Sequence, residues 1–318
     1  SRDLGDLDLK KLPTAALVKT LEHPNNWMRR MARRMLMERR PHQGIEGEAV
    51  IGLTHLWRDA GSATTRTEAM WTLGSANYFG AIQTSTNPLV TDSSDELAPI
   101  RAWCARWIGE NPHRPILFSD PKTIEALTKL ASDSDPIVRY SVAVALRQSS
   151  ESRLTVDRGT FKPWSASAWQ VLAALLKNDD KDSPRYAFAV WQALEPQISS
   201  NPAGSIEWLS GIAPTTQPLS LVLSHKAMRR VCDTREAKNL DLAVAFCDKI
   251  AAQDVLLANA LSGLVKGQEG GIIKPTKDVS ASVAAWRTSK NDDVRRSAQQ
   301  LAVLRRTGVL DAAAASQL

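Results

Sequence analysis

The sequence predicts an all-α protein, an α-solenoid built from stacked pairs of amphipathic helices. Apolar residues recur at helical spacing, short turns repeatedly join two such segments, and alternating strand patterns are almost absent. The clearest unit covers residues 121–149. Its first segment spaces Ile124, Leu127 and Leu130 along one helical face, and its second segment does so with Val138, Val142, Ala145 and Leu146.

The turn inside this unit explains why a second helix begins there. Asp135 can accept hydrogen bonds from the free amides of a first helical turn, and Pro136 fits that turn because it has no amide hydrogen to satisfy. Further pairs follow the same order of helix, polar turn and helix. They are 12–21 with a helix to 40, 48–57 with 67–76, 166–177 with a helix through 194, 239–251 with 255–265, and 279–288 with a helix to 306. These units recur about every 40–50 residues, as in HEAT and armadillo-type arrays, which predicts about six to eight repeats.

Stacking of the pairs follows from their apolar surface. Each pair exposes too much of it to be stable alone, so neighbouring pairs cover one another and form a continuous core. The ten tryptophans fit this role: nine, including Trp27, lie within or at the start of predicted helices, and Trp164 lies just ahead of one. We therefore expect the tryptophans to form a stripe in the core. A base-stacking surface is the alternative.

The repeat pattern also sets the expected domain organisation. We expect an N-terminal extension at 1–11, a solenoid at 12–310 with irregular insertions near 78–95, 149–162 and 266–277, and a C-terminal linker at 311–318. The segment near 78–95 is expected to replace or shorten one first helix. The chain begins at Ser1 without a signal segment, so we expect a processed or excised piece.

Composition and charge exclude several classes of protein. Of the 318 residues 43% are hydrophobic and 23% are charged, which is typical of folded globular proteins and excludes wholesale disorder. No apolar run approaches the roughly 18–20 residues needed to span a bilayer. The formal charge of +6 is a mild excess over this length, so it permits an acidic partner or nucleic acid without demanding one.

No set of residues for catalysis, cofactor binding or metal binding emerges. The chain has no glycine-rich phosphate loop, no HExxH and no GxSxG, and its five histidines form no i, i+4 pair. Acidic residues lie in the turns between helices, where they cap helix N-termini. Cys104, Cys232 and Cys247 lack disulfide or zinc spacing and are expected to be buried free thiols. We therefore predict that this chain is not an enzyme and carries no cofactor or metal.

The one pronounced charge feature is the predicted helix 27–40. Its apolar residues recur every four residues, so Met28, Met31, Met35 and Leu36 are expected to form a buried stripe. The arginines are left on the other side, and the candidate partner-binding residues are Arg29, Arg30, Arg33, Arg34 and Arg40. They are compatible with a solvated or intramolecularly paired face, with a protein partner, or with nucleic-acid phosphates. The rest of the chain does not extend the basic stripe, which disfavours nucleic acid.

A second set of charges is expected to hold repeats in register. Arginines just inside second helices could face aspartates of neighbouring repeats and form a ladder along the inner surface. The residues expected to take part are Asp135, Arg139, Arg185, Asp292 and Arg295. Exposed ion pairs of this kind contribute about 0–1 kcal/mol each.

Three stretches also carry a family resemblance: LPTAALVKTLEHPNNWMRRMARRMLMERR at 12–40, EAMWTLG at 68–74 and DPIVR at 135–139. They resemble the HEAT-like region of large exported haem proteins of planctomycetes and verrucomicrobia. In that family a β-propeller similar to sugar dehydrogenases precedes the helical repeats, and a cytochrome c domain often follows. The present chain has no propeller and no CxxCH, so no catalytic or haem-binding residue is transferred to it. The resemblance implies a periplasmic or otherwise extracytoplasmic setting and a larger oxidoreductase parent.

These observations favour a non-catalytic scaffold that joins or docks other domains, with the propeller and the cytochrome c domain as expected partners. Two alternatives remain open. One is a HEAT-repeat nucleic-acid-binding protein or DNA glycosylase with a basic concave face, which would gather arginines and tryptophans around a carboxylate. The other is a cofactor lyase or chaperone, which would need a reactive Cys or His in a cleft.

Overall fold

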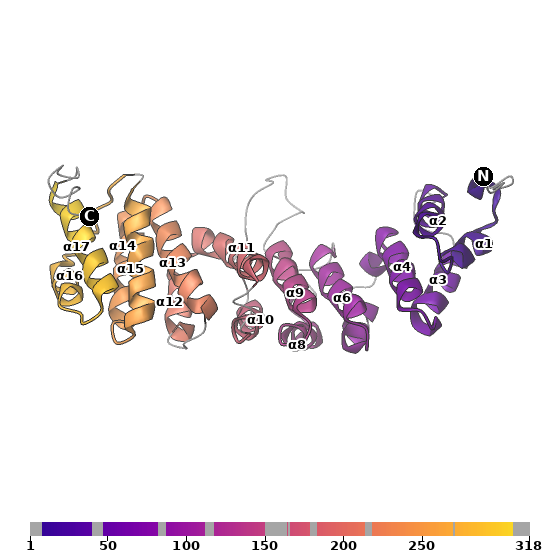
Figure 1. Ribbon diagram of the computed structural model, residues 1–318, viewed down its shortest axis with the longest axis horizontal. Coiled ribbons are helices and arrows are strands. Elements are labelled where there is room, and N and C mark those ends of the chain that lie inside the picture. The colour runs from indigo at the N-terminus through magenta and orange to yellow at the C-terminus, as the bar shows by residue number, and fades with distance from the viewer. Residues whose placement is uncertain are drawn as a thin grey trace. The chain divides into compact units, whose positions relative to one another are not determined.

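The computed structural model is all-helical, and Figure 1 shows helix following helix along the chain. It describes residues 8–39, 47–81, 87–111, 118–149, 164, 166–178, 183–213, 218–269 and 271–307. Within these ranges there is no β-strand. The prediction of an α-solenoid is confirmed. The chain divides into two compact units, Ser1–Ala145 and Leu146–Leu318, and each is described by itself.

Unit 1 consists of helix pairs in chain order. Short 3-10 turns lie at Leu9–Lys11, Tyr78–Ala81 and Asp92–Ser94. The α-helices are α1 (Thr14–Thr20), α2 (Asn26–Glu38), α3 (Gly47–Asp59), α4 (Ala63–Ser75), α5 (Pro88–Thr91), α6 (Ala98–Glu110), α8 (Pro121–Leu130) and α9 (Pro136–Ser149), of which the last turn is assigned to unit 2. The first helix of the third pair, α5, has only 4 residues.

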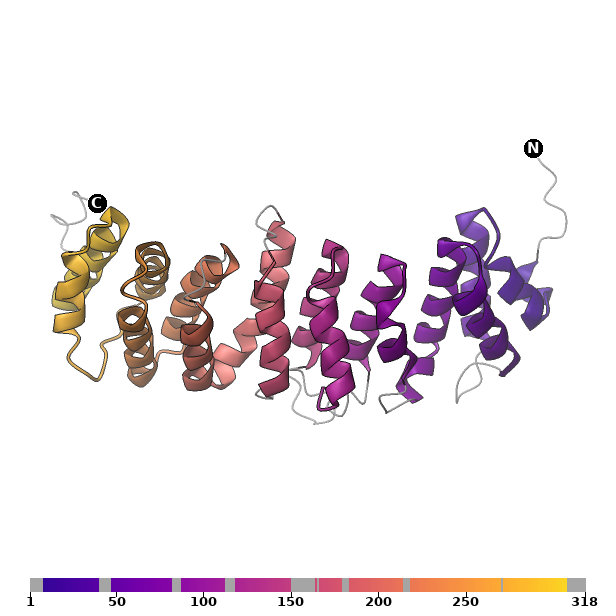
Figure 2. The same cartoon turned by 90° about the horizontal axis from the view of Figure 1, so that it is seen from below.

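Unit 2 repeats the same arrangement, and Figure 2 shows its pairs side by side. Its helices are α10 (Ala166–Leu176), α11 (Pro184–Ser200), α12 (Pro202–Ile212), α13 (Pro218–Asp233), α14 (Ala237–Lys249), α15 (Asp254–Gln268), α16 (Ser280–Arg287) and α17 (Asp292–Thr307). Second helices pack against one another: α11 on α13, α13 on α15, and α15 on α17. No described helix in either unit is both long and apolar enough to cross a membrane.

Polar caps and prolines determine where many of these helices begin. The side chain of Asn25 accepts a hydrogen bond from the amide of Trp27, and Asp120 accepts one from the amide of Thr123. Such caps satisfy amides that have no partner within the helix. Proline occupies the first turn of α8, α11 and α12, where its missing N–H is no loss.

The core of each unit lies between its packed helices. The largest fully buried side chains include Trp57 and Leu53 in unit 1 and Tyr186 and Phe246 in unit 2. The Tyr186 hydroxyl donates to the carbonyl of Leu175 at 2.8 Å, so the one polar atom of this buried ring is satisfied.

Glycines allow α13 and α15 to approach closely. A Cβ on Gly263 would lie 2.1 Å from the backbone oxygen of His225, and one on Gly267 would lie 2.5 Å from the Cβ of Cys232. The two helix backbones therefore meet where only hydrogen atoms fit between them. Large side chains are excluded from this contact.

The segment after α15 covers an apolar cavity of unit 2. Ile272, Ile273 and Pro275 line a partly open cavity of about 40 Å³ together with Val244 of α14 and Trp286 of α16. Arg235, at the end of α13, fixes the segment by donating to the carbonyl of Gly271 at 2.7 Å. The lining of the cavity is almost entirely apolar and offers water few hydrogen-bond partners, so it is a small apolar gap between the packed helices.

Two local expectations are wrong. The helix expected to reach Arg40 ends at Glu38, and Arg40 lies outside the described residues. Trp27, expected in the core, is 56% exposed, because it shares a face of α2 with the exposed Arg30 and Arg34, away from the buried Met35 and Leu36. The insertion expected near 266–277 stays a prediction, and α15 continues to Gln268. The expected insertion at 149–162 lies almost entirely outside the described residues, and the C-terminal linker at 311–318 lies wholly outside them.

Candidate partner-binding surface

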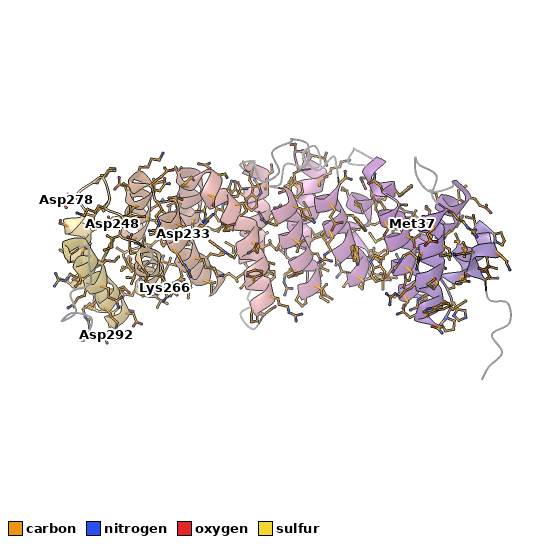
Figure 3. The ribbon with its side chains drawn as sticks, turned by 90° about the horizontal axis from the view of Figure 1, so that it is seen from above. Met37, Asp233, Asp248, Lys266, Asp278 and Asp292 are labelled. Atoms are coloured by element: carbon orange, nitrogen blue, oxygen red, sulfur yellow. The ribbon has the colours of Figure 1, made fainter. Side chains whose placement is uncertain are left out.

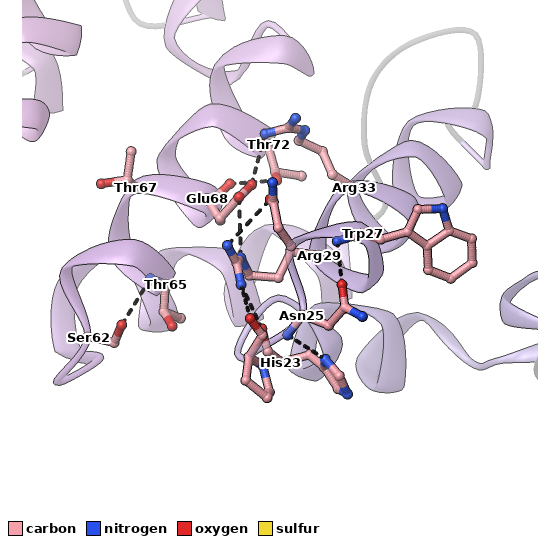
Figure 4. A network of polar contacts seen from close by, with 12 residues as sticks. His23, Asn25, Trp27, Arg29, Arg33, Ser62, Thr65, Thr67, Glu68 and Thr72 are labelled. Carbon is pink, nitrogen blue, oxygen red and sulfur yellow. Dashed lines mark hydrogen bonds and ion pairs between the residues drawn. The ribbon is translucent and has the colours of Figure 1, made fainter. Parts of the chain in front are cut away.

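The arginines of α2 divide into partly buried and exposed members. Arg33 donates to one carboxylate oxygen of Glu68 on α4 at 2.8 Å, and Arg29 approaches the other at 3.5 Å (Figure 4). The side chains of Arg29, Arg33 and Glu68 are 14%, 27% and 5% exposed. Of the readings left open for the α2 arginines, intramolecular pairing is therefore the one that Arg29 and Arg33 adopt. Glu68 on the neighbouring second helix turns them inward.

Arg30 and Arg34 remain exposed on α2. Arg34 pairs with Glu38 one turn further along at 2.6 Å, and both side chains are open to solvent. Arg30 makes no ion pair with any described carboxylate. Together with the exposed Trp27, these two arginines form the α2 surface. It combines a large apolar ring with cationic groups, a composition enriched at binding hot spots.

A repeated arginine contact fixes the turn within several pairs. Arg29 donates to the carbonyls of His23 and Pro24 at 2.9 Å each, as Figure 4 shows for His23. The fourth residue of other second helices does the same with the carbonyls five and six residues before it. Arg101 bonds Asp95 and Glu96, Arg139 bonds Asp133 and Ser134, and Arg295 bonds Ser289. The guanidinium thereby satisfies turn carbonyls that face the helix start.

Two arginines at the fourth position of second helices also contact the next pair in unit 1. Arg101 binds the carboxylate of Asp133 through two bonds of 2.7 and 2.8 Å, with side chains only 15% and 10% exposed. Arg66 likewise pairs with Asp95 and donates to the carbonyl of Trp57 at 2.8 Å. Sequence reasoning missed Arg66 and Arg101. The signal was present, because both occupy the same fourth helical position as Arg139.

The pKa of Asp133 is lowered in this arrangement. Burial by itself raises the pKa, but it is outweighed by the hydrogen bonds from Arg101 and from the amide of Asp135, and by the charges of Arg101 and Arg139. The charged form of Asp133 is thus the one that the fold stabilises.

The residues expected to form the inter-repeat ladder lie as follows. Asp135 caps α9 through the amide of Ile137 at 2.8 Å, and the turn bonds of Arg139 fall within its own pair. Asp292 and Arg295 pair with each other on α17, three residues apart. Arg185 is exposed in the first turn of α11. A ladder through these five residues stays a prediction.

Aromatic rings and cations continue across the second helices of unit 1. Arg33 lies 5.5 Å from the ring centre of Trp71, Trp71 meets Trp103 edge to face at 5.6 Å, and Arg106 lies 5.3 Å from Trp103. Trp107 packs so tightly that a Cβ on Gly74 would lie 2.3 Å from its ring. These half-buried tryptophans stabilise the stack through their ring contacts and are not free platforms.

Metal-ligand clusters and thiols were the remaining candidates for a reactive site in the described residues. They contain no group of three or more His, Cys, Asp or Glu that could hold a metal ion. All three cysteines are buried free thiols. Burial raises the pKa of Cys232 to about 12 and raises those of Cys104 and Cys247 well above the ordinary value, so these thiols are poor nucleophiles.

The helix pairs, the arginine-fixed turns and the stacked second helices define the chain as an α-solenoid protein. Residues 87–195 match a family model of HEAT repeats, a segment that runs from α5 into α11. The chain therefore contains a HEAT-like repeat region. Repeats of this type generally act as protein-interaction scaffolds and are typically non-enzymatic. No curated protein sequence matches the chain.

Proposed function

We propose that this chain is a protein-interaction scaffold that engages a partner through the α2 surface, formed by Trp27, Arg30 and Arg34. The observation that carries the proposal is the exposure of Trp27, at 56%, beside two exposed arginines. An exposed indole is costly to keep in water, and burial in a partner's pocket removes that cost.

The neighbouring contacts support this role by holding α2 in place. Arg29 and Arg33 are fixed to Glu68, and Arg29 also holds the turn before the helix. The α2 surface is therefore presented on a rigid element, which reduces the entropy lost on binding.

The finer proposal is an interdomain role. In a larger exported redox protein, the repeats would hold a sugar-dehydrogenase-like propeller near a cytochrome c domain in an extracytoplasmic compartment. This proposal rests on the sequence resemblance at 12–40, 68–74 and 135–139. Sequencing the gene on both sides of the chain tests it: an open reading frame with neither domain nearby contradicts it.

The α2 surface is tested by photo-crosslinking. Benzoylphenylalanine placed at Trp27 is expected to capture one discrete protein or neighbouring domain in an extract of the source cells. The same reporter at Ile51, a 66% exposed site on the first helix α3, is the matched control. Adding Arg30→Glu and Arg34→Glu to the Trp27 reporter is expected to remove the product. Equal capture at positions 27 and 51 contradicts the proposal.

Nucleic acid is the competing occupant of this surface. Its phosphates would be retained through Arg30 and Arg34, with affinity falling steeply as salt rises. A gel shift with duplex DNA at about 50 mM salt distinguishes the two, since a protein scaffold is expected to leave the DNA unshifted.

A further inference from the structure

Unit 2 carries a second exposed surface, formed by one face of α11 and one face of α13. On α11, Arg185, Phe188 and Trp191 recur every three residues and so share a face. On α13, Val222, Lys226 and Arg229 do the same at spacings of four and three residues. We call these six residues the α11–α13 patch. Phe188 is 56% exposed and Val222 is 39% exposed.

Lys226 joins the two rows of the patch. Its ammonium nitrogen lies 5.9 Å from the ring centre of Phe188 and 5.5 Å from that of Trp191. The cation and the two rings are thus adjacent across the packed helices α11 and α13. The cation–aromatic contacts also keep the Lys226 side chain over the rings.

The cations of the patch have no carboxylate partner among the described residues. Arg185, Lys226 and Arg229 form no ion pair there. Their neighbour Arg230, by contrast, pairs with Glu195 at 2.7 Å, and Lys266 on α15 pairs with Glu269 at 3.0 Å (Lys266 is labelled in Figure 3). Among the described residues, the cations Arg230 and Lys266 beside the patch are therefore neutralised, and the three cations of the patch are not.

The histidine beside the patch reports the same local charge. His225 lies on α13 next to Lys226 and is half-buried. Burial lowers its pKa, a hydrogen bond with the backbone of Asn259 opposes that effect, and the charges of Arg229, Lys226 and Lys266 lower the pKa further. Three cations thus act on one imidazole from α13 and α15.

We infer that the α11–α13 patch binds an acidic segment of a partner protein that also carries a large apolar side chain. The carboxylates of such a segment would pair with Arg185, Lys226 and Arg229, and its apolar side chain would cover Phe188 and Val222. A polyanion without apolar groups would leave these two side chains in water. The inference rests on the scaffold role proposed above and adds a second binding surface with defined partner chemistry.

Fluorescence anisotropy of the full chain with a labelled peptide tests the inference. The probe is a 16-residue peptide of glutamate with leucine and tryptophan spaced for one helical face. A second peptide has every glutamate replaced by glutamine. We expect the acidic peptide to bind at least tenfold more tightly than the glutamine peptide, with affinity falling as salt rises.

Variants then locate the binding site. Lys226→Glu with Arg229→Glu, and separately Phe188→Ala, are expected to weaken acidic-peptide binding at least tenfold. The matched control is Lys238→Glu with Arg287→Glu, which makes the same charge change at exposed sites on the first helices α14 and α16. Circular dichroism melts of all variants verify that they fold.

Four outcomes overturn the inference. They are no binding of the acidic peptide at millimolar concentration, equal weakening by the control variant, tighter binding of a 20-nucleotide single strand than of the peptide, and a self-associated chain that Phe188→Ala makes monomeric. The Trp27 crosslink is measured independently. If the acidic peptide does not bind but the Trp27 reporter captures a partner, only the inference about the patch fails. If the peptide binds but the Trp27 reporter captures nothing, only the proposed α2 surface fails.

Discussion

At the scale of single residues, largely buried arginine–carboxylate pairs join helices that are far apart in the sequence. The carboxylate of Glu68 is 5% exposed and receives Arg29 and Arg33, while Asp133 receives Arg101 in a two-bond pair. Removing one partner of such a pair leaves the other desolvated without compensation. The two carboxylates can be tested separately.

Glu68→Gln is expected to lower the free energy of unfolding by about 1–3 kcal/mol, because two partly buried guanidinium groups lose their counter-charge. Urea denaturation followed by circular dichroism measures the change. Glu125→Gln, at an exposed position of α8, is the control and is expected to change stability by less than about 0.5 kcal/mol. A Glu68 variant as stable as the control contradicts this account.

Asp133 is expected to make the stability of the fold depend on pH. Its pKa is lowered in the folded state, so its contribution is present above the unfolded-state pKa of about 3.9 and is lost as pH falls through the lower folded value. The protein is therefore expected to be more stable than Asp133→Asn at pH 6, by about 1–3 kcal/mol. The difference is expected to shrink as pH falls below about 4. Urea titrations of both proteins at several pH values measure it, and a constant difference down to pH 2 excludes the assignment.

At the scale of helices, close approach is permitted by small residues at particular positions. The α13–α15 contact depends on Gly263, whose missing side chain lets the backbone oxygen of His225 come near. Apolar periodicity alone does not reveal this requirement, because a glycine within a helix normally only lowers the helix propensity. The close packing of α13 against α15 is what requires glycine at position 263.

Gly263→Ala is expected to destabilise the protein by about 1–3 kcal/mol, because the new methyl group forces the two helices apart. Gly211→Ala is the matched control in the same unit, since a Cβ there meets nothing within 4 Å. That substitution is expected to be neutral or to stabilise by up to about 1 kcal/mol through helix propensity. Thermal melts of both variants measure the contrast, and equal effects would show that α13 and α15 tolerate separation.

At the scale of the whole molecule, each unit forms its core by stacking helix pairs against their neighbours. Cys104 lies in the core of unit 1, and Cys232 and Cys247 lie in that of unit 2. In a stack of this kind a residue is protected by its own pair and by the adjacent ones. The thiols therefore report on the packing of both units.

All three thiols are expected to be unreactive toward Ellman's reagent in the native protein at pH 8. They are expected to react fully in concentrated urea, because unfolding removes the burial that raises their pKa values. In a Cys104→Ser variant, the only thiols that can react are Cys232 and Cys247, so its reaction with the reagent reports on unit 2 alone. Rapid reaction of any thiol under native conditions would contradict the packing described here.

Sequence pattern alone accounted for the all-helical class, the order of the pairs and the burial of the cysteines. It also located helix starts such as Asp135–Pro136, because capping and periodicity depend on residues close in the chain. Trp27 was expected in the core together with the other tryptophans, and the structure shows an exposed ring. Only the tertiary structure decided which charged side chains are paired. Arg29 and Arg33 pair with Glu68, and Arg101 pairs with Asp133. These contacts join residues that are 32–39 positions apart in the sequence. The α11–α13 patch likewise exists because two helices pack side by side, which no local pattern encodes.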